Sequence, residues 1–351
     1  MNLQSAYFIL YLFVPTFGIG LNWYVLWRLL RIARKSVNRF ETTSALPLAA
    51  MSAGDSVTLF TELVQTLFHI IPKSGLPKWI LSGTCKIDLY LMHTTSAFSV
   101  WCWLLLSTLR YIAVFHPIKY RTIWRQPRNA LKQVFSLGCC CLVFESWILV
   151  VVVYSEDGRI CTEKPSISQY NLKAAHLMDI VLFYAIPFLI RIFFDGIVLI
   201  QCYGRFLRVD TPVFKTRCTG IVSSQNRSFN KMRCISQYLY FLFQHYAKKR
   251  RLHLKKKSAM IRRSITISVV NLILNLPFQI FRTWQTVDYD SLDQSILSTI
   301  EPVCQILYFS QFICNAFYLS TSIYETSCTH RSILLKNGRQ SLKCVSTDNY
   351  S

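Results

Sequence analysis

The sequence predicts an all-α membrane protein, built as a bundle of seven transmembrane helices. Three observations lead to this fold class. Hydrophobic residues make up 52% of the 351 residues and charged residues only 16%, against about 25% charged residues in an average soluble domain. The apolar residues are gathered in seven long runs. Basic residues lie between alternate runs, as they do in multi-pass membrane proteins.

Seven segments are long enough to cross a bilayer, which takes a helix of about 20 residues. Three of them, 6–27, 89–109 and 302–324, contain no Asp, Glu, Lys or Arg. Because lipid cannot hydrogen-bond to the backbone, each spanning segment must form a helix. The expected helices are 6–28, 45–71, 85–112, 131–154, 176–204, 258–284 and 300–321, followed by a short amphipathic helix over 322–334; together they make one domain over 1–335.

The positive charge indicates an orientation. Of the 39 Lys and Arg residues, 30 fall in 28–39, 119–132, 205–263 and 331–343, which lie on one side if the helices alternate. The positive-inside rule then places the N-terminus outside and the C-terminus in the cytosol. The first run exceeds the core of a signal peptide and has no basic leader, so we expect the mature protein to keep it.

The long basic third intracellular loop, expected over 205–258, carries much of the net charge of +22. Between two membrane spans, we expect this charge to face water, inner-leaflet lipid or a cytosolic partner, and not nucleic acid. A short cytosolic tail follows over 336–351. Cys328 and Cys344, near and in this tail, are either palmitoylated or free thiols.

Thirteen cysteines are present, and the expected topology leaves most of them in helices or cytosol, where thiols stay reduced. Cys85 and Cys161 face the oxidising side. A bond between them would close a loop of 77 residues and contribute about 4–5 kcal/mol in the chain-entropy model. The alternative is a pair of free thiols.

The stretch LRYIAVFHPIKYRT, residues 109–122, resembles the D-R-Y-x-A-V-x-x-P-L signature of rhodopsin-like (class A) G-protein-coupled receptors. The interval of 25 residues from Cys85 to Arg110 equals the family spacing. Further family positions are matched by Leu21-Asn22 and Val25, Asp55, Pro187 and Pro277. The resemblance covers about residues 6–335. It implies a plasma-membrane receptor that binds an extracellular ligand and activates a heterotrimeric G protein.

Several family positions are changed. Leu109 replaces the aspartate of the signature, Asn271 and Asn275 replace Phe and Trp, and Leu319 replaces the tyrosine of N-P-x-x-Y. Divergence of this kind looks most like invertebrate receptors, particularly the nematode, peptide-receptor-like branch. In the family, acids at the positions of Leu109 and Lys257 restrain the arginine that is Arg110 here. Neither residue can accept a hydrogen bond from it, so raised basal activity is a further expectation; the alternative is that the changes at Asn275 and Leu319 cost the active state as much.

The resemblance assigns roles to two groups of residues. Contact with the G protein is expected from Arg110, Tyr111, Pro117 and Ile118. The alternatives are that Arg110 only anchors its helix at the membrane edge and that Ile118 packs in a loop. A sodium site is implied at Asp55 and Ser99, within a polar switch network of Asn22, Asp55, Ser99, Asn275, Gln311 and Asn315. The alternative is the same network without a cation.

The ligand class is narrowed by two absences. The aspartate of aminergic receptors is Met92 here, and the Schiff-base lysine of opsins is Phe309. Both charge signs at the outer helix ends suit a short peptide with polar ends; a small chemosensory ligand is the alternative. The expected ligand-binding residues are Glu62, Gln65, Asp88, Met92, His93, Asp179, Gln279, Arg282 and Gln305.

No arrangement for catalysis is found in the sequence. The seven histidines are scattered without metal-ligand spacing, and neither G-x-x-x-x-G-K nor H-E-x-x-H occurs, so we expect neither an enzyme nor a cofactor. A transporter or channel is the alternative of another class. It would favour internal repeats, and no repeat is evident.

Overall fold

The computed structural model describes residues 3–35, 45–70, 77–123, 127–155, 160–164, 166–209, 262, 265–287 and 299–318. The chain divides into two compact units, Met1–Ile192 with Ile267–Ser351, and Phe193–Thr266. In the second unit the described residues are the end of one helix, 193–209, and residues 262, 265 and 266. Everything below concerns the first unit, which holds the helices that form the candidate site.

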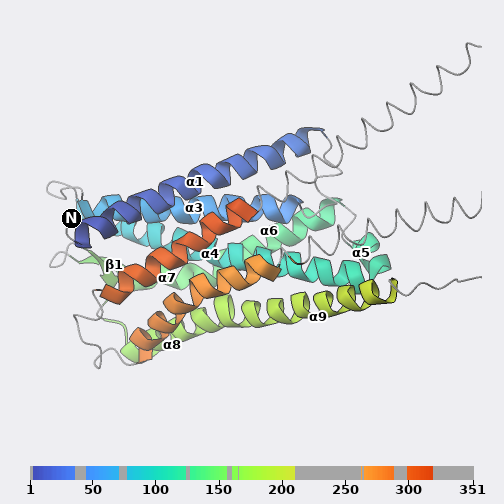
Figure 1. Cartoon of the computed structure of the whole chain (residues 1–351). Helices are drawn as coiled ribbons and strands as arrows, with labels where there is room; N and C mark the ends of the chain where they lie inside the picture. The colour runs from blue at the N-terminus through green and yellow to red at the C-terminus, as the bar shows by residue number, and fades with distance from the viewer. Residues whose placement is uncertain are drawn as a thin grey trace, which may run out of the picture. The chain divides into compact units, whose positions relative to one another are not determined.

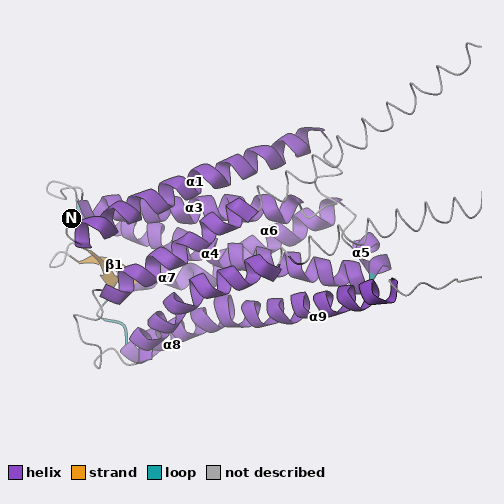
Figure 2. Cartoon of the chain, in the orientation of Figure 1, coloured by secondary structure: helices purple, strands orange, loops and turns teal. Residues whose placement is uncertain are grey.

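Helices make up nearly all of the described chain (Figure 2). The first four are α1 (Leu3–Lys35), α3 (Ala45–Ile70), α4 (Lys78–Phe115) and the short α5 (Pro117–Ile123). Next come α6 (Pro127–Phe144), which continues as α7 (Ile148–Val151), and α8 (Gln169–Ile180), which continues as α9 (Ile186–Val209). Two further helices lie over 265–287 and 299–318. Within the described residues, five helices are long and apolar enough to cross a membrane: Tyr7–Lys35, Lys78–Phe115, Asn129–Val151, Gln169–Gln201 and Ile265–Val287.

Several expectations fall outside the described residues. These are the amphipathic helix over 322–334, the tail over 336–351, most of the basic loop over 205–258, and the individual residues Lys257, Leu319, Cys328 and Cys344.

The helices pack through small residues, since lipid gives no hydrophobic drive for one helix to bind another. α3 lies against both α1 and α4, and Figure 1 shows α1 and α3 running alongside each other. At Gly18 of α1, an added Cβ would lie 2.6 Å from Cδ1 of Leu59 on α3. Leu59 is fully buried, so its side chain would have to shift within the interface to admit a larger residue at Gly18.

Several helix ends differ from the sequence expectation; α1 continues to Lys35 and α8 begins at Gln169, and two further ends have a clear local reason. α4 begins at Lys78, directly after Pro77, which is seven residues before the expected start. Proline is favoured at a helix start because it has no N–H to be left unsatisfied there. At the other site, α7 ends at Val151 and the chain continues as the strand β1 (Val152–Ser155), because consecutive β-branched residues favour extended backbone.

β1 pairs antiparallel with β2 (Ile160–Glu163), and the register places Tyr154 opposite Cys161. This hairpin lies at the end of the bundle where α1 begins (Figure 1). Tyr154 packs edge-on against Phe68 of α3, with 6.3 Å between ring centroids. The hairpin therefore touches the end of the bundle that contains the cavity described below.

Between α8 and α9 the helix widens into a π turn, η2 (Val181–Ala185). Pro187 follows it by two residues. Proline has no N–H to donate to the carbonyl four residues earlier, and its ring crowds that carbonyl, so the preceding turn opens. Such widened turns add a residue to the helical repeat and shift the direction of the side chains around them. Tyr184, within this turn, is buried.

Candidate functional site

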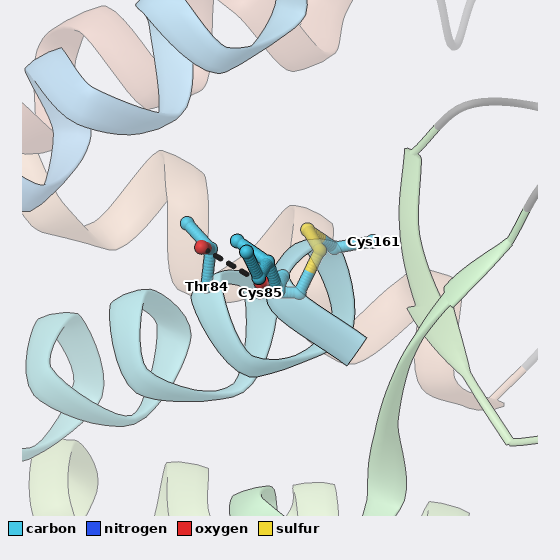
Figure 3. The surroundings of a disulfide bond; sticks show 4 residues. Thr84, Cys85 and Cys161 are labelled. Carbon is cyan, nitrogen blue, oxygen red and sulfur yellow. Dashed lines mark hydrogen bonds between the residues drawn. A yellow bond between two sulfur atoms is a disulfide. The ribbon is translucent and has the colours of Figure 1, made fainter. Parts of the chain in front are cut away.

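A disulfide ties the hairpin to α4, as predicted (Figure 3). Cys85 and Cys161 are bonded, with their Cα atoms 5.6 Å apart. Cys85 lies within a buried cluster that includes Ile148 and Val152. Next to it, Thr84 turns its hydroxyl back onto its own helix and donates to the carbonyl of Ile80 over 2.9 Å. The bond thus holds β2 against the first turns of α4.

A cavity of about 570 Å³ lies at this end of the bundle, among α1, α3, α4, η2 and the helices over 265–287 and 299–318. Six of the nine expected ligand-binding residues line it: Glu62, Gln65, Met92, His93, Arg282 and Gln305. The remaining lining is mostly aromatic or apolar, and consists of Phe8, Tyr11, Thr66, Leu89, Ser96, Tyr184, Phe278, Tyr308 and Phe309.

On one side of the cavity, which we call the paired wall (His176, Asp179 and Arg282), the charges are matched. Nη2 of Arg282 lies 2.8 Å from Oδ2 of Asp179, and the Asp179 side chain is 2% exposed. Nη2 of Arg282 also lies 3.3 Å from Nδ1 of His176. His176 in turn contacts Oε1 of Glu163, on β2, through Nε2 over 2.6 Å. Asp179, expected to bind ligand, instead holds Arg282 from behind the cavity surface.

Glu145 belongs to the same region, although nothing in the sequence singled it out as a site residue. Donor atoms of His93, Glu145 and Asp179 all lie within 4.8 Å of one another, close enough to hold a metal ion. The nearest cation to Asp179 in the described chain is Arg282, which supplies positive charge that a metal would otherwise provide. We therefore describe the cluster as an ion-pair network.

The opposite side of the cavity, which we call the acidic wall (Glu62 on α3, with Asp88 on α4 behind it), has no matching cation. Glu62 is only 6% exposed and lines the cavity. Asp88 does not line the cavity, but its charge acts on Glu62. Among the described residues, the carboxylate of Glu62 has no hydrogen bond and no salt bridge.

The deepest part of the cavity is formed by hydroxyl groups that the sequence analysis missed. Ser96 is hydrogen-bonded to Tyr308 and lies 3.2 Å from the hydroxyl of Tyr184, while the two tyrosine hydroxyls are 3.0 Å apart. The Phe278 ring lies over Tyr308, with 4.7 Å between centroids. A spacing signal was present: Ser96 follows Met92 by four residues and Tyr308 follows Gln305 by three, which places each pair on one helix face.

Below the cavity, Asp55 lies at the centre of a buried polar network. Its Oδ1 accepts a hydrogen bond from Ser99, and its Oδ2 accepts one from Nδ2 of Asn315 over 3.3 Å. Asn271 donates to Oδ1 of Asn315 over 2.7 Å. Asn22 reaches the same helix as Asn315 by donating to the carbonyl of Phe312 over 3.4 Å.

Each carboxylate oxygen of Asp55 thus has a hydrogen-bond donor. The hydroxyl oxygen of Ser99 keeps its lone pairs while it donates, so these contacts are compatible with both alternatives. A sodium site at Asp55 and Ser99 stays a prediction, as does the same polar network without a cation.

Five of the expected residues line a second cavity of about 160 Å³: Ser99, Asn275, Gln279, Gln311 and Asn315. Nε2 of Gln279 donates to Oδ1 of Asn275 over 3.2 Å. Gln279 was expected to bind ligand; it lines this second cavity, although its neighbour Phe278 lines the first. Arg191 also lines this cavity; it donates to Ser268 through Nε over 3.0 Å, and its guanidinium lies 4.4 Å from the centroid of the Trp103 ring.

The far end of α4 carries the residues expected to contact the G protein. Leu109 is buried in an apolar cluster with Ala130, whereas Arg110 and Tyr111 are partly exposed. Tyr111 stacks on Phe115, with 4.8 Å between centroids. After α4 ends, Pro117 begins α5, and Ile118 is 78% exposed. A strongly exposed isoleucine at a helix start offers an apolar surface to a partner.

Comparisons with known proteins agree with the fold. The family described as 7 transmembrane receptor (rhodopsin family) matches residues 21–318. The chain is 48% identical, over 99% of both sequences, to a Caenorhabditis elegans protein named "Probable G-protein coupled receptor AH9.4". It is 31% identical to "Tachykinin-like peptides receptor 86C" of Drosophila melanogaster, over 36% of this chain and 25% of that one.

The family match covers most of the chain, and the first relative covers nearly all of it. The family is a class of receptors and not of enzymes, and its members cross the plasma membrane with seven helices. The chain therefore belongs to the rhodopsin family of seven-transmembrane, G-protein-coupled receptors.

Proposed function

We propose that this receptor binds a short peptide from outside the cell in the cavity of about 570 Å³ and activates a heterotrimeric G protein through the opposite end of α4. The volume lies within the range of about 300–1,000 Å³ that is usual for ligand sites. Groups of both charge signs border the cavity, which suits a peptide backbone and its side chains. A relative in Drosophila melanogaster is named for tachykinin-like peptides.

The orientation in this proposal rests on two independent observations. The disulfide and the hairpin lie at the end of the bundle where α1 begins, and disulfides form on the oxidising side of a membrane. The expected connections at the other end carry 30 of the 39 basic residues, which favours the cytosolic side. Both observations support a cavity that faces outward.

The proposed signalling surface consists of Arg110, Tyr111, Pro117 and Ile118. Its support is the exposure of Ile118 together with the partial exposure of Arg110 at the end of a helix that reaches the ligand cavity. One continuous helix, α4, carries both Met92 and His93 in the cavity lining and Arg110 near its far end. A displacement at one end of such a helix can be transmitted to the other.

The first experiment identifies the ligand class. Cells expressing the full-length receptor are exposed to pools of synthetic short peptides and to pools of small volatile compounds, with calcium and cAMP as readouts. We expect activation by at least one peptide pool. Activation by small compounds alone would replace the peptide proposal with the chemosensory alternative. A ligand-dependent current in cells lacking G proteins would contradict the receptor mechanism.

The second experiment tests the signalling surface with the active pool. Arg110→Ala and Ile118→Ala should each abolish or strongly reduce G-protein activation, while binding of the same pool and surface density stay within about twofold of wild type. The control is Val150→Ala, since Val150 is also an exposed apolar residue, 68% accessible, but lies at the opposite end of the bundle. Loss of binding together with signalling would mean that Arg110 only anchors α4.

A further inference from the structure

The ligand cavity has an unequal distribution of charge, and the imbalance is centred on Glu62. Its side chain lies in the C-terminal half of α3 and lines the cavity, yet it is 94% buried, since only 6% of it is exposed. A carboxylate removed from water is costly unless a positive charge or hydrogen-bond donors compensate it.

The nearest donors are used elsewhere. The hydroxyl of Tyr11 donates to Oε1 of Gln305 over 2.5 Å. The hydroxyl of Thr66 donates to the backbone carbonyl of Glu62 over 2.9 Å and not to its side chain. Within the part of the chain that the structure describes, nothing donates to the carboxylate of Glu62. The group is thus turned toward the cavity without a protein partner.

The cation of the cavity lining is also in use. Arg282 is held by Asp179 at 2.8 Å, so these two charges offset each other. Asp88, on α4, adds a second negative charge near Glu62. The acidic wall thus contains two carboxyl groups that no cation of the described chain pairs with.

We infer that Glu62 binds a positively charged group of the ligand, an ammonium or a guanidinium, inside this cavity. The inference rests on the proposed function, since it names the chemistry that the proposed peptide must carry. A ligand cation would supply the missing partner for Glu62 and would form a charge-assisted hydrogen bond in a site shielded from water. An anionic ligand group would meet Glu62 unfavourably and would have to displace Asp179 from Arg282.

The test uses purified full-length receptor in lipid nanodiscs and two matched pools of N-acetylated tetrapeptide amides. One pool has arginine at a fixed position and the other has citrulline there, which keeps the size of the side chain but removes its charge. Apparent affinity is read from the rise in the temperature of thermal unfolding with pool concentration. N-acetylargininamide and N-acetylcitrullinamide serve as single-residue probes of the same difference.

For wild type, we expect the arginine pool to bind at least about 30-fold more tightly than the citrulline pool. In Glu62→Gln this preference should disappear, while the citrulline pool binds as it does to wild type, which also shows that the variant is folded. Asp88→Asn should weaken arginine binding by up to about fivefold. The matched control is Glu301→Gln, a half-buried carboxylate near the same end that does not line the cavity; it should keep the preference.

Each other outcome has a definite meaning. Equal binding of the two pools to wild type overturns the inference but leaves the peptide proposal intact, and needs no variant. Equal loss in Glu62→Gln and Glu301→Gln overturns it too, since it indicates a diffuse negative field. Binding of N-acetylargininamide through Glu62, without binding of either pool, overturns the peptide proposal and supports the inference. If no probe binds, both fail.

Discussion

The two sides of the ligand cavity treat charge in opposite ways. On the paired wall, Arg282 is matched by Asp179 at 2.8 Å, and His176 joins this pair to the hairpin through Glu163. On the acidic wall, Glu62 is just as deeply buried and has no partner among the described residues. Both walls are polar. The paired wall connects elements of the fold to one another, whereas the acidic wall leaves the carboxyl group of Glu62 without a partner among the described residues.

The charges of the paired wall stabilise the receptor, whereas the carboxyl group of the acidic wall is available to a ligand. Removing one member of a buried pair leaves its partner exposed to an apolar environment, which is strongly destabilising. Removing a buried charge that has no partner relieves a cost instead. The same kind of substitution, carboxylate to neutral residue, should therefore have opposite effects on the stability of the two walls.

The largest effect is expected where the hairpin is fixed to α4, because the hairpin carries Glu163 of the paired side. Cys161→Ser removes the bond to Cys85 and opens a loop of 77 residues, which should lower the free energy of unfolding by about 4–5 kcal/mol. Thermal unfolding of the purified receptor measures it. Cys139→Ser, at an exposed free cysteine of α6, is the control. Equal unfolding temperatures for both variants would show that the bond adds no stability.

The second effect breaks the paired wall itself. Asp179→Ala leaves Arg282 buried without its partner and should destabilise the receptor by about 3–5 kcal/mol. The double variant Asp179→Ala with Arg282→Ala should recover a large part of this loss, because no uncompensated charge remains. A double-mutant cycle on unfolding temperatures measures the interaction. Additive losses would mean that the two side chains do not interact.

The third effect has the opposite sign and concerns the acidic wall. Glu62→Gln should leave the ligand-free receptor as stable as wild type or stabilise it by about 1 kcal/mol, because ligand sites commonly trade stability for binding. Unfolding temperature in nanodiscs without ligand is the measurement. A loss comparable to that of Asp179→Ala would reveal that Glu62 has a structural partner.

The smallest effect is expected at the outer link of the paired wall. His176 and Glu163 approach to 2.6 Å, but their side chains are 22% and 47% exposed, so water screens their interaction. A double-mutant cycle with His176→Ala and Glu163→Gln should give an interaction of about 0.2–1 kcal/mol, decreasing as salt is added. An interaction as strong as that of Asp179 with Arg282 would show that the hairpin shields this pair from water.

Much of this molecule could be predicted from the sequence because lipid imposes simple rules on the chain. Apolar runs gave the helices, and topology gave the bond between Cys85 and Cys161. The spacing of polar residues on the helices gave most of the cavity lining, including Glu62 and Arg282. These features depend on one segment at a time, or on the side of the membrane that a segment faces.

The missed features depend on how helices meet. The hydroxyl cluster of Ser96, Tyr184 and Tyr308 joins three helical segments, and Tyr184 lies in the π turn, whose extra residue changes which side chains face inward. Gln279 lines the second cavity, whereas Phe278 and Arg282 of the same helix line the first, because the cavity that a side chain faces depends on how its helix is rotated against its neighbours. Pairing of Asp179 with Arg282 could not be read from either segment alone.

Because Leu109 is buried, the effect of changing this altered signature residue at the end of α4 depends on the residues that pack against it. Leu109 replaces the family's aspartate and packs in an apolar cluster with Ala130, so two segments are adapted to each other. Restoring the acid alone would bury a carboxylate in a cluster whose side chains, apart from Tyr120, are all apolar. The resulting loss of stability would conceal any effect on signalling. Reversion to the family pattern is thus not a neutral step for this receptor, and it becomes informative only when the surrounding cluster is changed with it.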